Sequence, residues 1–465
     1  MKRGTNLRIA VDALDDGGAG VGIVRGDGSG VTDGGHDTRL PTTVRIAGAL
    51  PGEDVTACVD SLSTQQPVAW ASLRTIHRAS PDRVTPACAA YGRCGGCVMQ
   101  HLDVGAQLAW KDASLRQMLR AHHALAGVPV APPVASPLPL GYRNNSKLVA
   151  ARDDGGRLML GAYAPRSHDV VDLAGCAVAE PALGPAAAAL GDALRAHHVQ
   201  PYDESLLVGT LRYATLRANA RGQVLITLVT ATDAFPAGTS VATELIGRHP
   251  NIVGVVQNIN PSRGNAIYGD TERTLAGESI IHDQIGDVRL RVSSRAFFQA
   301  NRHVAHAAYQ AIIRALAPTK ADLVVDAYAG VGGIALTLAA TAGSVLGIEE
   351  HAAAVHAAMK SADLNQTTNA RFVADDVARA LVDVSRADLL VLNPPRKGCA
   401  PEVLRRSATL APRAIAYLSC APATLLRDIE LLASLGYRPD GLTLFDMLPH
   451  TTHSEVLAIL VRSGH

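Results

Sequence analysis

The residue with the clearest capacity for chemistry in this sequence is Cys420. It follows a short apolar run at 414–418 that is rich in strand formers, and it precedes a helical pattern at 424–434. Ligands in open α/β sheets bind at the carboxyl ends of the strands, and the amino end of a helix stabilises a thiolate. Cys420 is therefore a candidate nucleophile. The alternative is a buried thiol that only packs as a small apolar side chain.

A glycine-rich loop at 326–333 follows another predicted strand and precedes a helix. Gly330 and Gly333 let the backbone pass close to a ligand, and the helix amino end offers free N–H groups. The next strand ends at Glu349, whose carboxylate can bind both hydroxyls of a ribose. A dinucleotide site also uses such an acid, but this loop lacks the Gly-x-Gly-x-x-Gly spacing. The pattern favours S-adenosylmethionine over NAD.

A third polar group follows the strand predicted at 389–392, in Asn393-Pro-Pro-Arg396. Two prolines cannot continue a sheet ladder, so the chain leaves the sheet with the Asn393 side chain facing the crevice. An amide both donates and accepts hydrogen bonds, so it can pair twice with the edge of a uracil. The alternative interpretation is an ordinary turn.

The elements that must position these groups are strands and helices that alternate from residue 297 onward, which predicts a mostly parallel sheet covered on both faces. Residues 141–292 read mostly as strands. Short strands with Gly and Asp turns at 7–72, including a glycine-rich loop at 26–35, suggest an oligonucleotide-binding (OB) type β-barrel. The predicted fold class is α/β, and the predicted domains are the barrel at 1–72, a β-rich central region at 73–296 and a Rossmann-like domain at 297–465.

The chain has seven cysteines, an odd number spread through a long sequence, which favours metal binding or catalysis over disulfides. Cys88, Cys94 and Cys97 lie in one loop, and Cys176 is the natural fourth ligand of a four-thiolate site. The spacing resembles ferredoxin-type ligation, but four cysteines bind zinc equally well. The spacing alone leaves both metals open.

The composition restricts partners and location. The sequence shows no signal peptide and no uncharged apolar run of the ~18 residues that span a bilayer, so we expect a cytoplasmic protein without a membrane partner. A net charge of +1 argues weakly against nucleic acid but does not exclude a locally basic groove. The basic residues expected along such a groove are Arg143, Lys147, Arg152, Arg212, Arg217 and Arg396.

Several segments taken together resemble the RNA uracil-C5 methyltransferases. They are Phe297-Phe-Gln-Ala-Asn301, the loop 326–333, Asn393-Pro-Pro-Arg-Lys-Gly398, Ser419-Cys-x-Pro-Ala-Thr-Leu-x-Arg-Asp428 and the segment 446–457. Tyr142-Arg-Asn-Asn-Ser-Lys147 and the N-terminal barrel, which is similar to a TRAM module, extend the resemblance over nearly the whole chain. The resemblance implies a class I methyltransferase domain that uses S-adenosylmethionine.

The resemblance also implies roles for individual residues. Cys420 would be the nucleophile, Glu455 the general base and Phe297 a partner that stacks on the substrate base. The pocket for S-adenosylmethionine and uracil would be lined by Gln299, Tyr328, Glu349 and Asn393. The four cysteines would hold a [4Fe-4S] cluster, with zinc as the alternative.

Two positions depart from the usual family pattern. Ala329 stands where a cysteine is usual, and Asn393 stands where many members have Asp. The Asn form occurs among ribosomal-RNA enzymes, which favours 23S ribosomal RNA over transfer RNA as the substrate. We expect the protein to act as a monomer.

The chemistry requires this set of groups. Addition of a thiolate to C6 of uracil makes C5 nucleophilic enough to take a methyl group, and a base then removes the C5 proton so that the thiolate can leave. The target base must be unstacked, which suits single-stranded RNA. The alternatives are a tRNA uridine-C5 methyltransferase, an amino-group methyltransferase that needs no cysteine, and a non-catalytic iron–sulfur protein that binds RNA.

Overall fold

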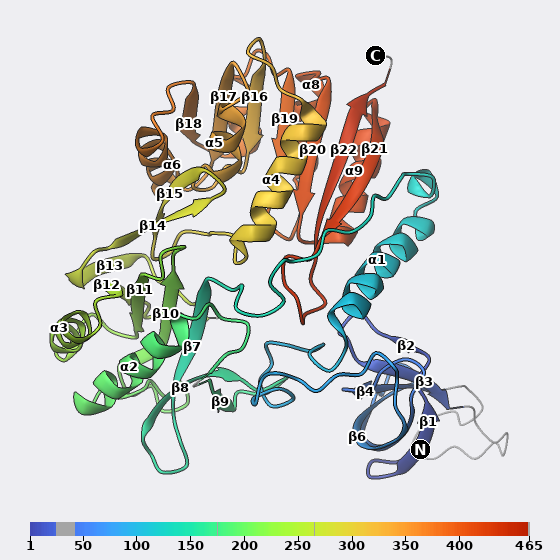
Figure 1. Ribbon diagram of the computed structural model, residues 1–465, viewed down its shortest axis with the longest axis vertical. Coiled ribbons are helices and arrows are strands. Elements are labelled where there is room, and N and C mark those ends of the chain that lie inside the picture. Colours follow the sequence, from blue (N-terminus) through green and yellow to red (C-terminus); the bar gives the residue numbers. More distant parts are fainter. Residues whose placement is uncertain (25–41, 174, 265, 464–465) are drawn as a thin grey trace. The chain divides into compact units, whose positions relative to one another are not determined.

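The structure is a computed structural model that describes residues 1–24, 42–173, 175–264 and 266–463 (Figure 1). The described chain divides into two compact units. The first comprises residues 1–110, 164–167 and 449–452, and the second comprises the remaining residues from 111 onward. None of the helices described is long and apolar enough to cross a membrane. The three-domain division stays a prediction.

The first unit contains a six-stranded sheet in the order β1-β5-β6-β4-β3-β2. Alternation along β5 buries Val55, Ala57 and Val59 against Val44 and Ile46. The predicted β-rich module is present. A closed barrel is not confirmed, because no ladder among the described residues joins the outer strands β1 and β2, and the predicted loop 26–35 lies outside the described residues. The strands are β1 (Asn6–Ala10), β2 (Ala13–Leu14), β3 (Gly20–Val24), β4 (Thr42–Ala47), β5 (Asp54–Leu62) and β6 (Val68–Arg78).

The second unit contains a central seven-stranded sheet in the order β13-β12-β11-β10-β7-β8-β9. Leu148 and Ala150 of β7 and Ala214 of β10 pack in one core with residues of α2 and α3, so these helices cover one face of the sheet. Lys147 and Thr215 lie on the opposite face, because successive side chains of a strand alternate. The elements are β7 (Asn145–Arg152), β8 (Leu158–Tyr163), β9 (Val170–Asp172), α2 (Leu183–Ala196), β10 (Leu211–Ala218), β11 (Val224–Thr230), α3 (Gly238–Arg248), β12 (Ile252–Ile259) and β13 (Thr271–Gly277).

Three further elements connect these sheets along the chain. Helix α1 (Val104–Ala121) is followed by a short 3₁₀ helix, His123–Leu125. The two-stranded sheet β14 (Ile280–Ile285) and β15 (Val288–Ser293) follows the central sheet, and the Arg291 N–H donates to Ser361 Oγ at 2.9 Å. This hydrogen bond fixes the hairpin against the C-terminal domain.

The C-terminal sheet has seven strands in the order β18-β17-β16-β19-β20-β22-β21. All pairs are parallel except those of β22, which is antiparallel to both neighbours. The strands are β16 (Leu323–Ala327), β17 (Ser344–Glu349), β18 (Ala370–Ala374), β19 (Leu389–Leu392), β20 (Ala414–Ser419), β21 (Tyr437–Phe445) and β22 (Glu455–Arg462). The helices are α4 (Arg302–Leu316), α5 (Gly333–Ala339), α6 (Ala352–Leu364), α7 (Val377–Ala380), α8 (Pro401–Thr409) and α9 (Pro422–Ser434).

The strand order creates a crevice at one edge of this sheet. The chain moves from β16 outward to β17 and β18, and then returns to the other side of β16 for β19 and β20. Ligands of open α/β sheets bind at such a switch point, outside the carboxyl ends of the strands. Because β22 is antiparallel, its amino end lies at this same edge. The predicted alternation of strands and helices from residue 297 onward is confirmed.

Candidate active site

A cavity of about 490 Å³ lies within the second unit. Its walls come from the open face of the central sheet, from the segment 294–300 before α4, and from the C-terminal sheet edge. The predicted site residues that line it are Cys420, Glu455, Phe297, Gln299, Arg143, Lys147 and Arg396. The structure therefore brings the candidate nucleophile and base together with four of the basic residues expected along the RNA groove, since Arg217 also lines the cavity.

The pairing of β20 with β22 places Cys420 beside Glu455. Ser419 is opposite Val456 in the antiparallel ladder, so the next residues along each strand, Cys420 and Glu455, leave the ladder side by side. Pro422 begins α9 two residues after Cys420, where the missing N–H of proline costs no helical hydrogen bond. The thiol is thus held between a buried strand and a helix amino end.

Burial sets the protonation of this pair. Glu455 is buried, and the loss of solvation raises the pKa of its carboxyl from 4.5 to about 7. Burial also raises the pKa of the Cys420 thiol, and the neighbouring Glu455 carboxylate raises it further. At neutral pH the cysteine is a thiol, and the glutamate stands near half ionisation. A carboxylate with that pKa is well matched to accept a proton at pH 7.

Arg396 opposes both shifts. Its positive charge lowers the pKa of Cys420 and the pKa of Glu455, because it favours the anionic form of each group. Its Nη2 lies 3.4 Å from His453 Nε2. The sequence predicted Arg396 only as a contact to RNA, whereas the structure places its charge at the thiol.

The segment before α4 is held in place by hydrogen bonds to Asn144. Asn144 Nδ2 donates to the Gln299 carbonyl at 2.7 Å, and the Asn144 N–H donates to the Ala300 carbonyl at 2.9 Å. Asn301 caps α4 by accepting from the Val304 N–H at 3.2 Å. Gln299 is buried, but Phe297 is 73% exposed. A rigid segment therefore presents one free aromatic ring at the cavity.

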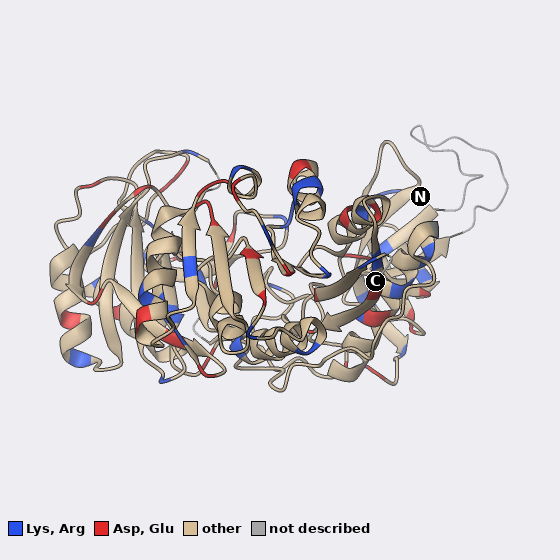
Figure 2. Ribbon diagram, turned by 90° about the horizontal axis from the view of Figure 1, so that it is seen from above, with Lys and Arg blue, Asp and Glu red and all other residues tan. Residues whose placement is uncertain are grey.

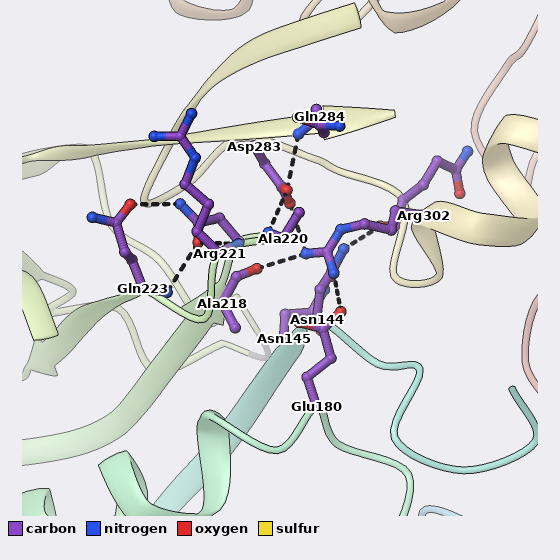
Figure 3. A network of polar contacts seen from close by, with 12 residues as sticks. Asn144, Asn145, Glu180, Ala218, Ala220, Arg221, Gln223, Asp283, Gln284 and Arg302 are labelled. Atoms are coloured by element: carbon purple, nitrogen blue, oxygen red, sulfur yellow. Dashed lines mark hydrogen bonds and ion pairs between the residues drawn. The ribbon is translucent and has the colours of Figure 1, made fainter. Parts of the chain in front are cut away.

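Figure 3 shows the buried network that fixes the start of α4. Arg302 donates to Glu180, to Asp283 Oδ2 at 2.9 Å and to the Ala218 carbonyl at 3.0 Å. These partners come from the segment before α2, from β14 and from the end of β10. Loss of solvation raises the pKa of Glu180 to about 7 despite the Arg302 charge. The network ties the central sheet, the hairpin and α4 into one framework around the segment 297–301.

Three cations form a positive wall of the cavity. Burial lowers the pKa of the Lys147 ammonium, and the like charges of Arg143 and Arg217 lower it further. Arg217 lies 5.9 Å from the centre of the Phe298 ring and donates through Nη2 to the Ala296 carbonyl at 2.8 Å. Its Nε and Nη1 atoms are buried without a partner in the described part of the chain. Cations that lack carboxylate partners among the described residues favour binding of an anion.

Apart from Gln299, the residues predicted to bind S-adenosylmethionine lie at the same sheet edge but do not line this cavity. Glu349 ends β17 and accepts from the Gly330 N–H at 3.1 Å and from the His351 N–H at 3.0 Å. Gly330 has a φ of +55°, and a Cβ there would meet nothing within 4 Å. The loop therefore has open space beside it, as the approach of a ligand requires.

The glycine at 332 is required by the packing under the loop. Gly332 has a φ of +86°, and a Cβ on it would lie 3.0 Å from Phe372 Cζ. Gly333 begins α5, so its N–H belongs to the free helix amino end. Asp326 is fully buried, and burial raises the pKa of its carboxyl to about 7, although a backbone hydrogen bond from Ala335 lowers it. The free N–H groups at the amino end of α5 thus remain available for a polar cofactor.

Tyr328 and Asn393 follow the neighbouring strands β16 and β19. Tyr328 adopts a left-handed backbone with a φ of +67°, which is strained for a residue with a Cβ. Burial and the adjacent Cys399 raise the pKa of its hydroxyl, so it remains a neutral donor. Asn393 is partly buried at the carboxyl end of β19, beside the Ala327 carbonyl.

The four cysteines predicted to bind a metal are divided between the two units. Cys88, Cys94 and Cys97 belong to the first unit, and Cys176 belongs to the second. Within the described residues, no group of three or more His, Cys, Asp or Glu side chains is arranged to hold a metal ion. The cluster therefore stays a prediction.

Sequence reasoning missed Thr215, Thr227 and Tyr268, which also line the cavity. Thr215 and Arg217 alternate on β10, so strand periodicity could have placed both on one face, whereas Tyr268 lies in a segment without a motif. Arg212 was predicted in the same groove and does not line it. Its side chain is 3% exposed and donates to the carbonyls of Asn260 and Ser262 at 3.0 and 2.6 Å.

The fold and the site define a class I S-adenosylmethionine-dependent methyltransferase. The model of the tRNA (uracil-5-)-methyltransferase family matches residues 255–463. An uncharacterized RNA methyltransferase of Gloeobacter violaceus is 36% identical over the whole of this chain and 98% of its own length. One of Listeria innocua is 33% identical over 99% of this chain and 98% of its own.

A solved structure extends this agreement to the fold. The Pyrococcus abyssi tRNA (uracil-54, C5)-methyltransferase in complex with S-adenosyl-L-homocysteine superposes with a TM-score of 0.77, at 25% identity, over 98% of this chain and all of that one. The chain belongs to the RNA uracil-C5 methyltransferase family, and it is an S-adenosylmethionine-dependent RNA methyltransferase.

Proposed function

We propose that this enzyme methylates C5 of a specific uridine in RNA through a covalent adduct between Cys420 and C6. The observation that carries the proposal is the position of Cys420 beside Glu455, in a cavity that also holds three cations without carboxylate partners among the described residues. An amino-group methyltransferase needs neither the thiol nor a base beside it.

The side chains have defined tasks in this reaction. The Cys420 thiol releases its proton to solvent, and Arg396 favours the resulting thiolate. The cysteine sulfur forms a bond to C6 while the C5–C6 π electrons move onto O4 to give an enolate. S-adenosylmethionine supplies the methyl group that C5 receives and leaves as S-adenosylhomocysteine. Glu455 then takes the C5 proton, the C5–C6 double bond re-forms, and the sulfur–C6 bond breaks to give 5-methyluridine.

The positions of other residues support the binding of substrate and cofactor. Phe297 is the exposed ring available to stack on the uracil, and Arg143, Lys147 and Arg217 are placed for backbone phosphates. Gln299, Tyr328 and Asn393 would contact the cofactor and the base. Glu349 would bind the ribose. The amino end of α5, together with Gly330 and Gly333, would contact the remaining polar atoms of the cofactor.

The proposed target is 23S ribosomal RNA, and transfer RNA is the alternative. Asn393 supports ribosomal RNA through the resemblance described above, whereas the structural neighbour from Pyrococcus abyssi acts on uracil-54 of tRNA. The N-terminal strands at 1–72 would serve as a TRAM-like barrel of OB type that binds RNA. The enzyme would act as a cytoplasmic monomer.

Cys88, Cys94, Cys97 and Cys176 would bind a [4Fe-4S] cluster. Four soft thiolates suit such a cluster and zinc alike. The methylation transfers no electron, so the metal would have a structural role. Anaerobic purification followed by iron, sulfide and zinc analysis tests this assignment, because stoichiometric zinc without sulfide would refute the cluster.

RNA that contains 5-fluorouridine tests the mechanism and the target. Fluorine at C5 cannot be removed as a proton, so the adduct with Cys420 accumulates and migrates as a protein–RNA complex under denaturing conditions. We expect the wild type and a Cys58→Ala control to trap ribosomal RNA, and a Cys420→Ala variant to trap none. Trapping of transfer RNA alone would correct the target. Full methylation by Cys420→Ala would refute the mechanism and favour amino-group methylation.

A further inference from the structure

The second unit has another cavity, of about 430 Å³, whose lining shares no residue with the candidate active site. It is built on β7 and β10, with walls from the end of β8, the start of β9 and the segment 201–205. None of the predicted catalytic or cofactor-binding residues lines it. The function of this cavity therefore has to be inferred from the side chains that line it.

The two cavities share one face of the central sheet. Tyr213, Thr215 and Arg217 alternate along β10, and they pair with Val149, Lys147 and Asn145 of β7. Tyr213 and Val149 line the second cavity, whereas the next pairs along the same face line the first. Two residues of a strand span roughly 7 Å. A single polymer that crosses this face can therefore enter both cavities.

Aromatic side chains dominate the second cavity. It contains Tyr163, Tyr202 and Tyr213, in a chain that has only ten tyrosines. His168 lies edge-on to Tyr163, with ring centres 5.7 Å apart. Burial raises the pKa of the Tyr163 hydroxyl to about 12, so the ring stays neutral. Such a group of rings offers stacking faces to a planar ligand.

Arg212 holds two of these rings in place. Its guanidinium carbon lies 5.4 Å from the centre of the Tyr202 ring and 5.6 Å from the centre of the Tyr213 ring. Its Nη atoms are occupied by the carbonyls of Asn260 and Ser262 and by Glu204. Arg212 is thus a fixed support for the rings, and both of its Nη atoms already donate to protein groups.

The charges of the cavity balance, unlike those of the candidate active site. Arg212 pairs with Glu204 at 3.1 Å, and Asp203 accepts the N–H groups of Ser205 and Leu206. Arg152 lies at the cavity and donates to Gln200 and to the Gly156 carbonyl. A neutral cavity with several rings suits an uncharged planar group, whereas the positive wall of the first cavity suits a phosphate.

We propose that this cavity binds a second, unstacked nucleobase of the RNA substrate, at a position close to the target uridine. The inference rests on the proposed function, since it requires an RNA strand in the first cavity. A base held here would anchor the strand on the sheet face and fix which uridine reaches Cys420. Proteins that bind single strands gain affinity from bases stacked on aromatic rings.

A matched pair of variants tests the site. Tyr202→Leu removes the ring but keeps apolar bulk, whereas Tyr202→Phe keeps the ring. The probe is a short, unstructured, fluorescein-labelled RNA, with its duplex as a control, titrated without S-adenosylmethionine. We expect Tyr202→Leu to weaken single-strand binding about ten-fold, as expected for the loss of one stacked base, and Tyr202→Phe to bind like the wild type. S-adenosylmethionine binding by each variant verifies the fold.

Two results would overturn the proposal. One is wild-type affinity of Tyr202→Leu for the single strand, which would leave the cavity to another occupant such as a protein. The other, which does not depend on a variant, comes from photo-crosslinking the wild type to RNA that contains 4-thiouridine. Crosslinks in the segments 149–170 or 201–213 support the site, and crosslinks confined to residues of the first cavity refute it.

The outcomes separate this site from the proposed reaction. If RNA binding depends on Tyr202 but no adduct forms with 5-fluorouridine RNA, the proposed reaction is refuted and the second binding site is supported. Adduct formation together with binding independent of Tyr202 would refute the second site and leave the reaction.

Discussion

The substitution Glu455→Gln tests the buried base of the site through the free energy of unfolding, without any substrate. Glutamine keeps the size of the side chain and removes the charge. In the wild type the folded protein holds a carboxyl whose pKa is raised from 4.5 to about 7 because it is buried. An ionised carboxylate at this position therefore destabilises the folded state.

The sign and size of the effect follow from linkage between protonation and folding. Below pH 4.5 the carboxyl is protonated in both the folded and the unfolded protein, so it does not lower the free energy of unfolding. Between pH 4.5 and about 7 it ionises only in the unfolded state, so wild-type stability falls as the pH rises, and above 7 the loss is constant. One pKa unit corresponds to about 1.36 kcal/mol, so the loss approaches about 3 kcal/mol.

Urea unfolding of the wild type and Glu455→Gln across this pH range measures the effect. The stability of the variant relative to the wild type should grow by about 3 kcal/mol from acid to neutral pH, because titrating groups that do not interact with Glu455 cancel in the difference. Glu278→Gln, at an exposed position, serves as the control and should show no such growth. A difference that stays constant with pH would refute the burial argument.

The same variant has a second expected phenotype with RNA and S-adenosylmethionine. Without a base the C5 proton cannot leave, so methylated RNA should remain bound to Cys420 and be detected as a denaturation-resistant complex. Release of product at the wild-type rate would show that another group removes the proton.

Three further predictions concern the residues around the pair. Arg396→Gln should raise the pKa of Cys420 and shift its alkylation by iodoacetamide, followed by mass spectrometry, to higher pH; an unchanged profile would contradict the role of the arginine. Gly332→Ala should weaken S-adenosylmethionine binding measured by calorimetry, because the left-handed backbone and the contact with Phe372 distort the loop; unchanged affinity would place the cofactor elsewhere. Arg302→Met should lower the free energy of unfolding by about 3–5 kcal/mol, since it leaves the carboxylates of Glu180 and Asp283 without their cation. A loss below about 1 kcal/mol, measured by urea unfolding, would show that these carboxylates are solvated.

The spread of charge along the chain shows why composition was a poor guide to RNA binding. Lys and Arg lie interspersed with Asp and Glu over both units (Figure 2), and the sum is only +1. Many of these charges form exposed pairs, such as Arg379 with Asp375. The local excess in the first cavity arises because strand pairing brings together Lys147, Arg143 and Arg217 without carboxylates.

The sequence by itself determined the local elements of the C-terminal domain. The apolar run before Cys420, the glycines of the loop 326–333 and the prolines after Asn393 each act on neighbouring backbone, so their effects can be read from a few adjacent residues. The alternation of strands and helices likewise implied a parallel sheet with its polar groups at one edge. The barrel and the metal site were predicted from weaker patterns and stay predictions.

Only the tertiary structure decided which of these groups meet. Glu455 reaches Cys420 because β22 inserts antiparallel between β20 and β21 in one register, and a shift of one residue would turn its side chain to the other face. Tertiary packing likewise places the charge of Arg396 where it lowers the pKa of the Cys420 thiol, and it buries Arg212 outside the first cavity. Such contacts depend on the packing of segments far apart in the chain, and no local pattern of residues encodes that packing.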